Sequence, residues 1–221
     1  MEKINYEALV FDADPDNRIL AAEHGVGLDI LVHDPVLEVR IAVALQGCYL
    51  DTLVKDESPE IRVLVAKQGF GLDVLINDSD PLVREVAKYM SYVESDYYLG
   101  RIIAVKHGYG LEKLIHDNDR FVRKAVAEQG FGLDILIKDE DGGVRETVAR
   151  KGHGLDILIH DEEWYVRAAV AKQGYGLDIL INDQNSWVRL AVARQGYGLD
   201  ILVNDKDRGV RQVAAEMLQK T

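Results

Sequence analysis

Residues 164–183 read WYVRAAVAKQGYGLDILIND, and close copies of this stretch recur along the chain. Its most constant part is Gly-Leu-Asp-Ile-Leu, and successive copies begin 22 residues apart except at one place, where the step is 39 residues. A fixed period of this length is typical of repeat proteins, in which each repeat packs only against its neighbours. The copies and their close variants begin at Gly27, Tyr49, Gly71, Gly110, Gly132, Gly154, Gly176 and Gly198.

An arginine marks the same period along the chain. Successive arginines of this set, which we call the ladder arginines, are 22 residues apart, except that the step from Arg84 to Arg101 is 17. We therefore predict that residues 1–221 form a single repeat domain of ten units, regular at about 1–84 and 102–221 and irregular at about 85–101. The ladder arginines are Arg18, Arg40, Arg62, Arg84, Arg101, Arg123, Arg145, Arg167, Arg189 and Arg211.

One unit predicts two helices of unequal length. Ser58 is a candidate N-cap, Pro59 suits the first helical position and Gly69 suits the residue after the helix end. The segment 72–77 is short and shows no alternation of apolar and polar residues, so we predict a short α- or 3₁₀-helix there and not a strand. Because neither helix can bury its apolar face alone, the units are expected to stack into an all-α, α-solenoid fold.

Two recurring motifs carry a resemblance to known families. Residues 34–40, Asp-Pro-Val-Leu-Glu-Val-Arg, resemble the Asp-Pro-x-x-x-Val-Arg motif of HEAT-type repeats. The full unit, Val-Arg-x-Ala-Val-Ala-x-Gln-Gly-Tyr-Gly-Leu-Asp-Ile-Leu-Ile-x-Asp, more closely resembles the leucine-rich repeat variant family over essentially the whole chain. That resemblance implies a right-handed superhelix in which α-helices alternate with 3₁₀-helices and which serves as a generic scaffold. One founding type of the family carries a cysteine cluster for iron and sulfur, but Cys48 is the only cysteine here, so we expect no such cofactor.

The composition favours a soluble protein. The chain has 221 residues, a net charge of −12 and a pI near 4.9, which disfavours nucleic acid and anionic membranes as partners. Residues 1–110 hold 19 acidic and 10 basic side chains, so the acidic surplus is concentrated there. The sequence has no apolar run long enough to cross a bilayer and no signal-peptide pattern at residues 1–7. We expect a cytoplasmic protein that does not bind membranes.

Every ladder arginine except Arg101 has an aspartate six residues before it. We interpret this pattern as a hydrogen-bond ladder between repeats, in which each aspartate accepts from an arginine and from amides at a helix N-terminus. In this interpretation the side chain of Asp161 accepts from Arg167. The alternative is a row of arginines that binds anions. The residues assigned to the ladder are Asp34, Arg40, Asp56, Arg62, Asp161, Arg167, Asp183 and Arg189.

The sequence contains none of the catalytic motifs that we considered. Gly-x-Ser-x-Gly and His-Glu-x-x-His are both missing, and the Gly-Tyr-Gly-Leu-Asp segments follow no predicted strand, so they are not phosphate-binding loops. His33, His116 and His160 share one repeat position, but no two adjacent units offer histidines at the same position. We therefore predict no catalytic residue, no metal site and no cofactor.

In a repeat protein the positions that vary between units are the informative ones for binding. Both tryptophans fall on the predicted outward face of the long helix, in adjacent units, and an apolar stripe with i, i+4, i+8 spacing lies in the N-terminal half. Contiguous exposed apolar surface marks interaction sites, and Trp, Tyr and Arg are enriched in binding hot spots. The alternative is that these residues pack within the fold. The candidate partner-binding residues are Trp164, Tyr165, Trp187, Leu190, Lys172, Arg194, Phe121, Leu37, Ile41 and Leu45.

The irregular unit lacks the Gly-Leu-Asp-Ile-Leu element and holds four of the ten tyrosines. We expect these tyrosines to fill the space of a lost short helix. The alternative is that they present aromatic rings to a ligand. They are Tyr89, Tyr92, Tyr97 and Tyr98.

These observations together predict a non-enzymatic repeat scaffold that binds an unknown protein or peptide, as a monomer or a homodimer. One alternative is a HEAT-like nucleic-acid-binding protein or DNA glycosylase, in which Trp164, Trp187 and Asp183 would act on a flipped base. The low pI argues against it. The other alternative is a self-assembling structural protein that dimerises through Leu37 and Ile41.

Overall fold

The computed structural model describes residues 4–219, and every regular element in that range is a helix. Nineteen helices follow one another, and none of the described residues forms a strand. The prediction of an all-α protein is therefore confirmed, and the structure is compatible with an α-solenoid. The chain divides into two compact units, Met1–Asp96 and Tyr97–Thr221, and the division falls inside the predicted irregular segment.

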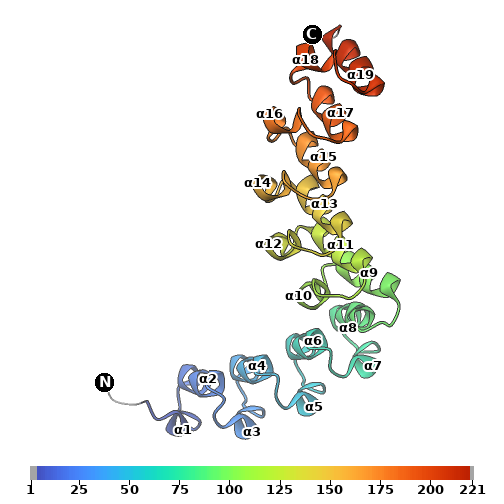
Figure 1. Cartoon of the computed structure of the whole chain (residues 1–221). Coiled ribbons are helices and arrows are strands. Elements are labelled where there is room, and N and C mark those ends of the chain that lie inside the picture. Colours follow the sequence, from blue (N-terminus) through green and yellow to red (C-terminus); the bar gives the residue numbers. More distant parts are fainter. Residues whose placement is uncertain (1–3, 220–221) are drawn as a thin grey trace. The chain divides into compact units, whose positions relative to one another are not determined.

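In the first unit, long helices alternate with helices of four residues. The long helices lie beside one another in one row and the short helices form a second row (Figure 1). The long helices are α2 (Pro15–Glu23), α4 (Leu37–Leu45), α6 (Pro59–Lys67) and α8 (Pro81–Val93), and the short helices are α1 (Tyr6–Leu9), α3 (Leu28–Leu31), α5 (Leu50–Leu53) and α7 (Leu72–Leu75).

The second unit repeats this alternation (Figure 1). No short helix lies between α8 and α9 in chain order, as predicted from the missing Gly-Leu-Asp-Ile-Leu element. The long helices are α9 (Tyr98–Lys106), α11 (Arg120–Gln129), α13 (Gly142–Arg150), α15 (Trp164–Lys172), α17 (Ser186–Arg194) and α19 (Arg208–Leu218). The short helices are α10 (Leu111–Leu114), α12 (Leu133–Leu136), α14 (Leu155–Leu158), α16 (Leu177–Leu180) and α18 (Leu199–Leu202).

Helix α6 shows how the sequence sets the ends of a long helix. Pro59 is its first residue, and Gly69 lies just beyond its end with a left-handed φ of 78°. Glycine suits that position because it has no Cβ to clash in the left-handed conformation. Ser58 occupies the N-cap position as predicted, but its hydroxyl donates to Glu60 and caps no helix amide. The boundaries are therefore confirmed, while the capping role predicted for the Ser58 side chain is wrong.

Each short helix except α1 begins after a residue with a left-handed backbone. Gly154, which precedes α14, has a φ of 57°, and a Cβ at this position would collide with Cδ1 of Ile137. Glycine is thus required here both by the backbone conformation and by close packing against the preceding repeat. The Gly154 carbonyl accepts from the amides of Ile157 at 3.1 Å and Leu158 at 3.0 Å, so the turn combines 3₁₀ and α hydrogen bonding.

The core of each unit is built from recurring positions of both helix types. The long helices bury valine and alanine, and each of α3, α5 and α7 buries its last leucine, as do the short helices of the second unit. Except for Ala215 on the last long helix, which is exposed, the alanine four residues after a ladder arginine has no exposed surface, which agrees with the predicted helical phase. These alanines are Ala22, Ala44, Ala66, Ala127, Ala149, Ala171 and Ala193.

The tyrosines of the irregular segment differ in their surroundings. Tyr89 and Tyr92, both on α8, are half-buried and contact each other edge to face, with ring centroids 6.2 Å apart. Tyr97 and Tyr98 are exposed, Tyr97 to 80%. The expectation that these tyrosines fill the space of a lost short helix is therefore wrong for Tyr97 and Tyr98, because neither is enclosed by other residues.

We expect Ala171→Leu to destabilise the protein by about 1–3 kcal/mol, because the larger side chain must enter a fully packed position. The measurement is the free energy of unfolding from urea titration. The matched control is Lys172→Leu at the exposed neighbouring position on α15, which should change the free energy by less than about 0.5 kcal/mol. An unchanged midpoint for Ala171→Leu would contradict the packing.

Candidate functional site

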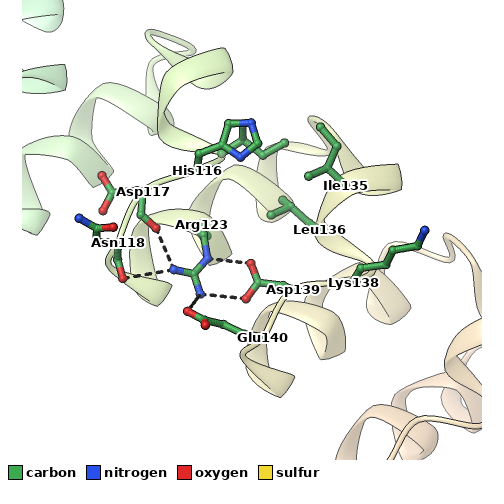
Figure 2. A pocket seen from close by; sticks show the side chains of 10 residues that line it. His116, Asp117, Asn118, Arg123, Ile135, Leu136, Lys138, Asp139 and Glu140 are labelled. Atoms are coloured by element: carbon green, nitrogen blue, oxygen red, sulfur yellow. Dashed lines mark hydrogen bonds and ion pairs between the residues drawn. The ribbon is translucent and has the colours of Figure 1, made fainter.

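The most regular polar feature of the structure is a series of arginine–aspartate pairs at the N-terminal ends of the long helices. Arg123 shows the geometry: its Nε donates to Oδ2 of Asp139 at 2.7 Å and its Nη2 donates to Oδ1 at 2.9 Å (Figure 2). Its Nη1 donates to the backbone carbonyl of Asp117 at 2.8 Å. Both side chains of the pair are almost fully buried. A bidentate hydrogen bond of this kind combines charge attraction with a fixed orientation of the guanidinium.

The aspartate that pairs with an arginine side chain lies sixteen residues after it, not six residues before it. Asp161 accepts from Nε of Arg145 at 2.7 Å, and Arg167 pairs with Asp183 at 2.6 Å. The predicted side-chain pair of Asp161 with Arg167 is therefore wrong, because Arg167 reaches only the backbone carbonyl of Asp161, at 2.6 Å. Arg167 thus joins two successive aspartates, Asp183 through its carboxylate and Asp161 through its carbonyl.

Each paired aspartate has a further role. Its Oδ1 accepts from the amide of the residue two positions later, which is the N-cap residue of the next long helix, as in the bond from Glu163 to Asp161 at 2.9 Å. Eight pairs in the described residues share this arrangement. They are Arg18–Asp34, Arg40–Asp56 and Arg62–Asp78 in the first unit, and Arg101–Asp117, Arg123–Asp139, Arg145–Asp161, Arg167–Asp183 and Arg189–Asp205 in the second.

The hydrogen-bonding capacity of these arginines bears on the anion-binding alternative. A guanidinium has five N–H donors. Arg123 makes five contacts, because Asn118 and Glu140 add a carbonyl at 3.2 Å and a carboxylate at 3.3 Å to the three described above (Figure 2). Within residues 4–219 no buried side-chain nitrogen or oxygen lacks a partner. A bound anion would therefore have to displace existing bonds, and the geometry favours a structural role for the row.

The pairs shift the ionisation of their members. Hydrogen bonding from Arg62 lowers the pKa of Asp78, and this effect outweighs burial, which acts in the opposite direction. The pKa of Asp205 is lowered in the same way by Arg189. The hydrogen bond to Asp78 correspondingly raises the pKa of Arg62. The folded state thus favours the ionised form of both partners.

The two tryptophans lie next to each other on the surface of the second unit. Trp164 begins α15 and Trp187 is the second residue of α17, and their ring centroids are 6.3 Å apart with an interplanar angle of 29°. Trp164 is 39% exposed and Trp187 is 59% exposed, so both lie outside the core, as predicted. Lys172 and Arg194, at the C-terminal ends of the same helices, are also exposed. The stacked pair is the largest exposed aromatic group of the two helices.

Leu190 and Tyr165 are less accessible than the tryptophans. Leu190 is half-buried on α17. Tyr165 is half-buried too and contacts the edge of Trp164, with ring centroids 5.7 Å apart and an angle of 85°. Its hydroxyl lies over Gly142, where a Cβ would collide with it. Tyr165 therefore supports the exposed tryptophan pair more than it extends it.

Phe121 belongs to a second aromatic group on the same unit. It contacts Tyr98 with ring centroids 6.1 Å apart, and the guanidinium of Arg120 lies 5.0 Å from the centre of its ring. Between this group and the tryptophans, the glycines at the start of α13 leave a cavity of about 180 Å³. This notch was not predicted from the sequence, although two consecutive glycines at a position that is aromatic in neighbouring units indicate it. The cavity is lined by Arg120, Phe121, Lys124, Asp141, Gly143 and Tyr165.

The apolar stripe predicted in the first unit is only partly continuous. Ile41 lines a surface groove of about 540 Å³, but Leu37 is half-buried and Leu45 is exposed outside the groove lining. The other apolar residues that line this groove lie on α6 and α8. The groove is lined by Ile41, Pro59, Glu60, Val63, Leu64, Asp80 and Leu82, and we call it the α4–α6–α8 groove.

Other residues considered in the sequence lie apart from these surfaces. Among residues 4–219, no three His, Cys, Asp or Glu side chains form a cluster suited to a metal ion. His153 contacts the exposed carboxylate of Asp134 at 2.8 Å, and Cys48 is exposed. None of the helices in the described part of the chain is long and apolar enough to cross a membrane.

Comparison with known proteins adds no assignment to this geometry. No protein-family model matches the chain, and no curated protein matches it either. The surfaces are therefore interpreted from their own chemistry.

We expect Asp161→Ala to destabilise the protein by about 1–3 kcal/mol, because Nε and Nη2 of Arg145 and the amide of Glu163 lose their acceptor. The free energy of unfolding is the measurement. Asp156→Ala, at an exposed carboxylate on α14, is the matched control and should change stability by less than about 0.5 kcal/mol. Equal losses in the two variants would show that the pairing adds nothing to stability.

The lowered pKa values of Asp78 and Asp205 predict a loss of stability in acid. Their contribution should be complete above the unfolded-state pKa of about 3.9 and should disappear as the pH falls through the lower folded-state pKa. The unfolding free energies of the wild type and Asp205→Asn should therefore converge below about pH 4. A difference that stays constant from neutral pH into strong acid would contradict this assignment.

Proposed function

We propose that this chain is a non-enzymatic scaffold that binds a protein or peptide on the outer surface of its long helices. In this proposal ten repeats of about 22 residues form a right-handed, HEAT-like α-solenoid of the leucine-rich repeat variant type, working in the cytoplasm. The regular alternation of long and short helices supports it, as does the recurrence of one arginine–aspartate geometry along each unit.

The exposed stack of Trp164 and Trp187 is the observation that carries the proposal. Large aromatic side chains that stay on the surface of a folded protein are typical of interaction sites, and tryptophan is enriched among binding hot spots. Both rings project from helices that are anchored by fully buried valines, Val166 and Val188. A surface held in this way loses little conformational entropy on binding.

The charge of the second unit indicates the kind of contact expected there. Residues 97–221 hold 19 acidic and 18 basic side chains, a net charge of −1. Long-range steering by charge is therefore weak, and apolar burial around the tryptophans should supply most of the affinity. The proposed partner at this surface is a peptide or protein segment with exposed apolar side chains, and its binding should depend little on salt.

The surroundings of Asp183 support a non-enzymatic role. A glycosylase of the type considered above would need an acidic residue available to the substrate. Both carboxylate oxygens of Asp183 accept from Arg167, at 2.6 and 3.0 Å, and Oδ1 also accepts from the amide of Asn185 at 2.8 Å. Burial raises the pKa of Asp183, but these bonds outweigh it and the net shift is downward. The carboxylate is thus ionised and already engaged.

We expect Trp187→Ala to weaken partner binding by about 2 kcal/mol or more while leaving the free energy of unfolding nearly unchanged. The experiment captures partners from the native cell with the full chain, identifies them by mass spectrometry and measures each dissociation constant with the purified protein. A partner that binds the wild type and is lost with Trp187→Ala supports the proposal.

The matched control is Ile179→Ala. Ile179 is an exposed apolar residue of the same unit, but it lies on the short helix α16. The Ile179→Ala variant should leave binding unchanged. A partner that tolerates Trp187→Ala, or one that is lost equally with both variants, would contradict a binding role for the tryptophan pair.

A further inference from the structure

The α4–α6–α8 groove lies wholly in the first unit. Three long helices contribute to it: Ile41 comes from α4, Val63 and Leu64 come from α6, and Leu82 comes from α8. Pro59 completes the apolar lining at the start of α6. At about 540 Å³ the groove can take several apolar side chains of a partner, but it is too small to receive a folded domain.

Leu82 is the most exposed apolar residue of the groove. It is 56% exposed, and it lies beside half-buried Ile41, Val63 and Leu64. Adjacent apolar residues that remain accessible on three neighbouring helices form a contiguous patch, whereas isolated exposed leucines need no explanation.

Two carboxylates lie at the N-terminal end of this apolar lining. Glu60 is in the first turn of α6, and Asp80 is the N-cap of α8, where its Oδ1 accepts from the amides of Leu82 and Val83 at 2.8 and 3.2 Å. Glu60 is exposed and accepts from the hydroxyl of Ser58. In the described part of the chain, neither carboxylate takes part in an ion pair within 4.0 Å. Both therefore remain available to cationic groups at the edge of the groove.

The net charge of the unit adds to this local pattern. Residues 1–96 hold 19 acidic and 8 basic side chains, a net charge of −11. A field of this sign attracts cationic partners and repels anionic ones, including a second copy of the same unit. The charge thus selects among the occupants that an apolar groove alone would accept.

We propose that the α4–α6–α8 groove docks a cationic amphipathic helix of a partner protein. Apolar side chains at i, i+3 and i+4 of that helix fill the space between Ile41, Val63 and Leu82, and a flanking lysine or arginine pairs with Glu60 and Asp80. This inference rests on the proposed scaffold function, since it names a partner class for a second surface of the same chain.

The test uses the full chain and a synthetic amphipathic peptide of leucine and lysine, with a leucine–glutamate peptide of the same pattern as the probe for charge. Binding is measured by fluorescence anisotropy of the labelled peptides at low and physiological salt. The leucine–lysine peptide should bind, and Leu82→Ala combined with Ile41→Ala should weaken its binding by about tenfold or more. Glu60→Gln should weaken it further and reduce its dependence on salt.

Two matched variants separate the groove from general attraction to an acidic protein. Val74→Ala removes an apolar residue that is 58% exposed on the short helix α7, and Asp73→Asn removes an exposed carboxylate from the same helix. Both should leave binding unchanged. If they weaken binding as much as the groove variants do, or if the leucine–glutamate peptide binds equally well, the proposal is overturned.

A homodimer detected by light scattering and dissolved by Leu82→Ala would also overturn the proposal, because the occupant would then be a second copy of the chain. The result of the peptide-binding test is independent of the test at the tryptophan pair. Trp187→Ala lies in the other unit and should not change binding of the leucine–lysine peptide. Peptide binding at the groove can therefore succeed or fail independently of the tryptophan surface.

Discussion

The paired arginines and aspartates that join successive repeats restrict which other residues of a repeat can vary. Burying two charges is unfavourable unless each finds partners, and removing one partner leaves the other charge buried and unpaired. Sixteen residues separate an arginine from its aspartate, and six separate that aspartate from the next arginine, so the two contacts together set the 22-residue period. Where the period breaks, Gly100 stands sixteen residues after Arg84, and the position has no carboxylate.

Because the ladder pairs and the buried core residues recur in the repeats, the residues that vary between repeats lie at other positions. The third and second residues before a ladder arginine begin the long helix, and all of them except Gly142 are at least partly exposed. They are Gly142 and Gly143 in α13, Trp164 and Tyr165 in α15, and Ser186 and Trp187 in α17. Side chains of very different size are tolerated there, because the valine that follows is fully buried in each helix. The same two positions therefore form a notch in α13 and an aromatic stack across α15 and α17, without a change in the buried valines.

Much of this arrangement can be predicted from the sequence. The parts that cannot be predicted have a definite physical reason. The long helices, their terminal glycines and the buried phase of Ala171 follow from spacing alone, because each depends on local geometry. The partner of Asp161 does not. In a regular repeat, every aspartate lies six residues before one arginine and sixteen after another, so the pattern is equally consistent with both pairings. Only the placement of successive helices shows that Arg145 reaches the carboxylate.

The contrast between recurring structural positions and variable positions also explains why the two units differ in net charge but share one repeat geometry. In residues 1–96, each ladder pair contributes one positive and one negative charge, so the three pairs Arg18–Asp34, Arg40–Asp56 and Arg62–Asp78 leave the net charge of −11 untouched. The whole acidic surplus therefore lies outside those pairs, for the most part in exposed residues such as Glu60. Because surface charges of this kind add little to stability, they can vary without loss of the fold. The charge of each unit is thus set by its exposed residues, and its stability by its buried pairs and core.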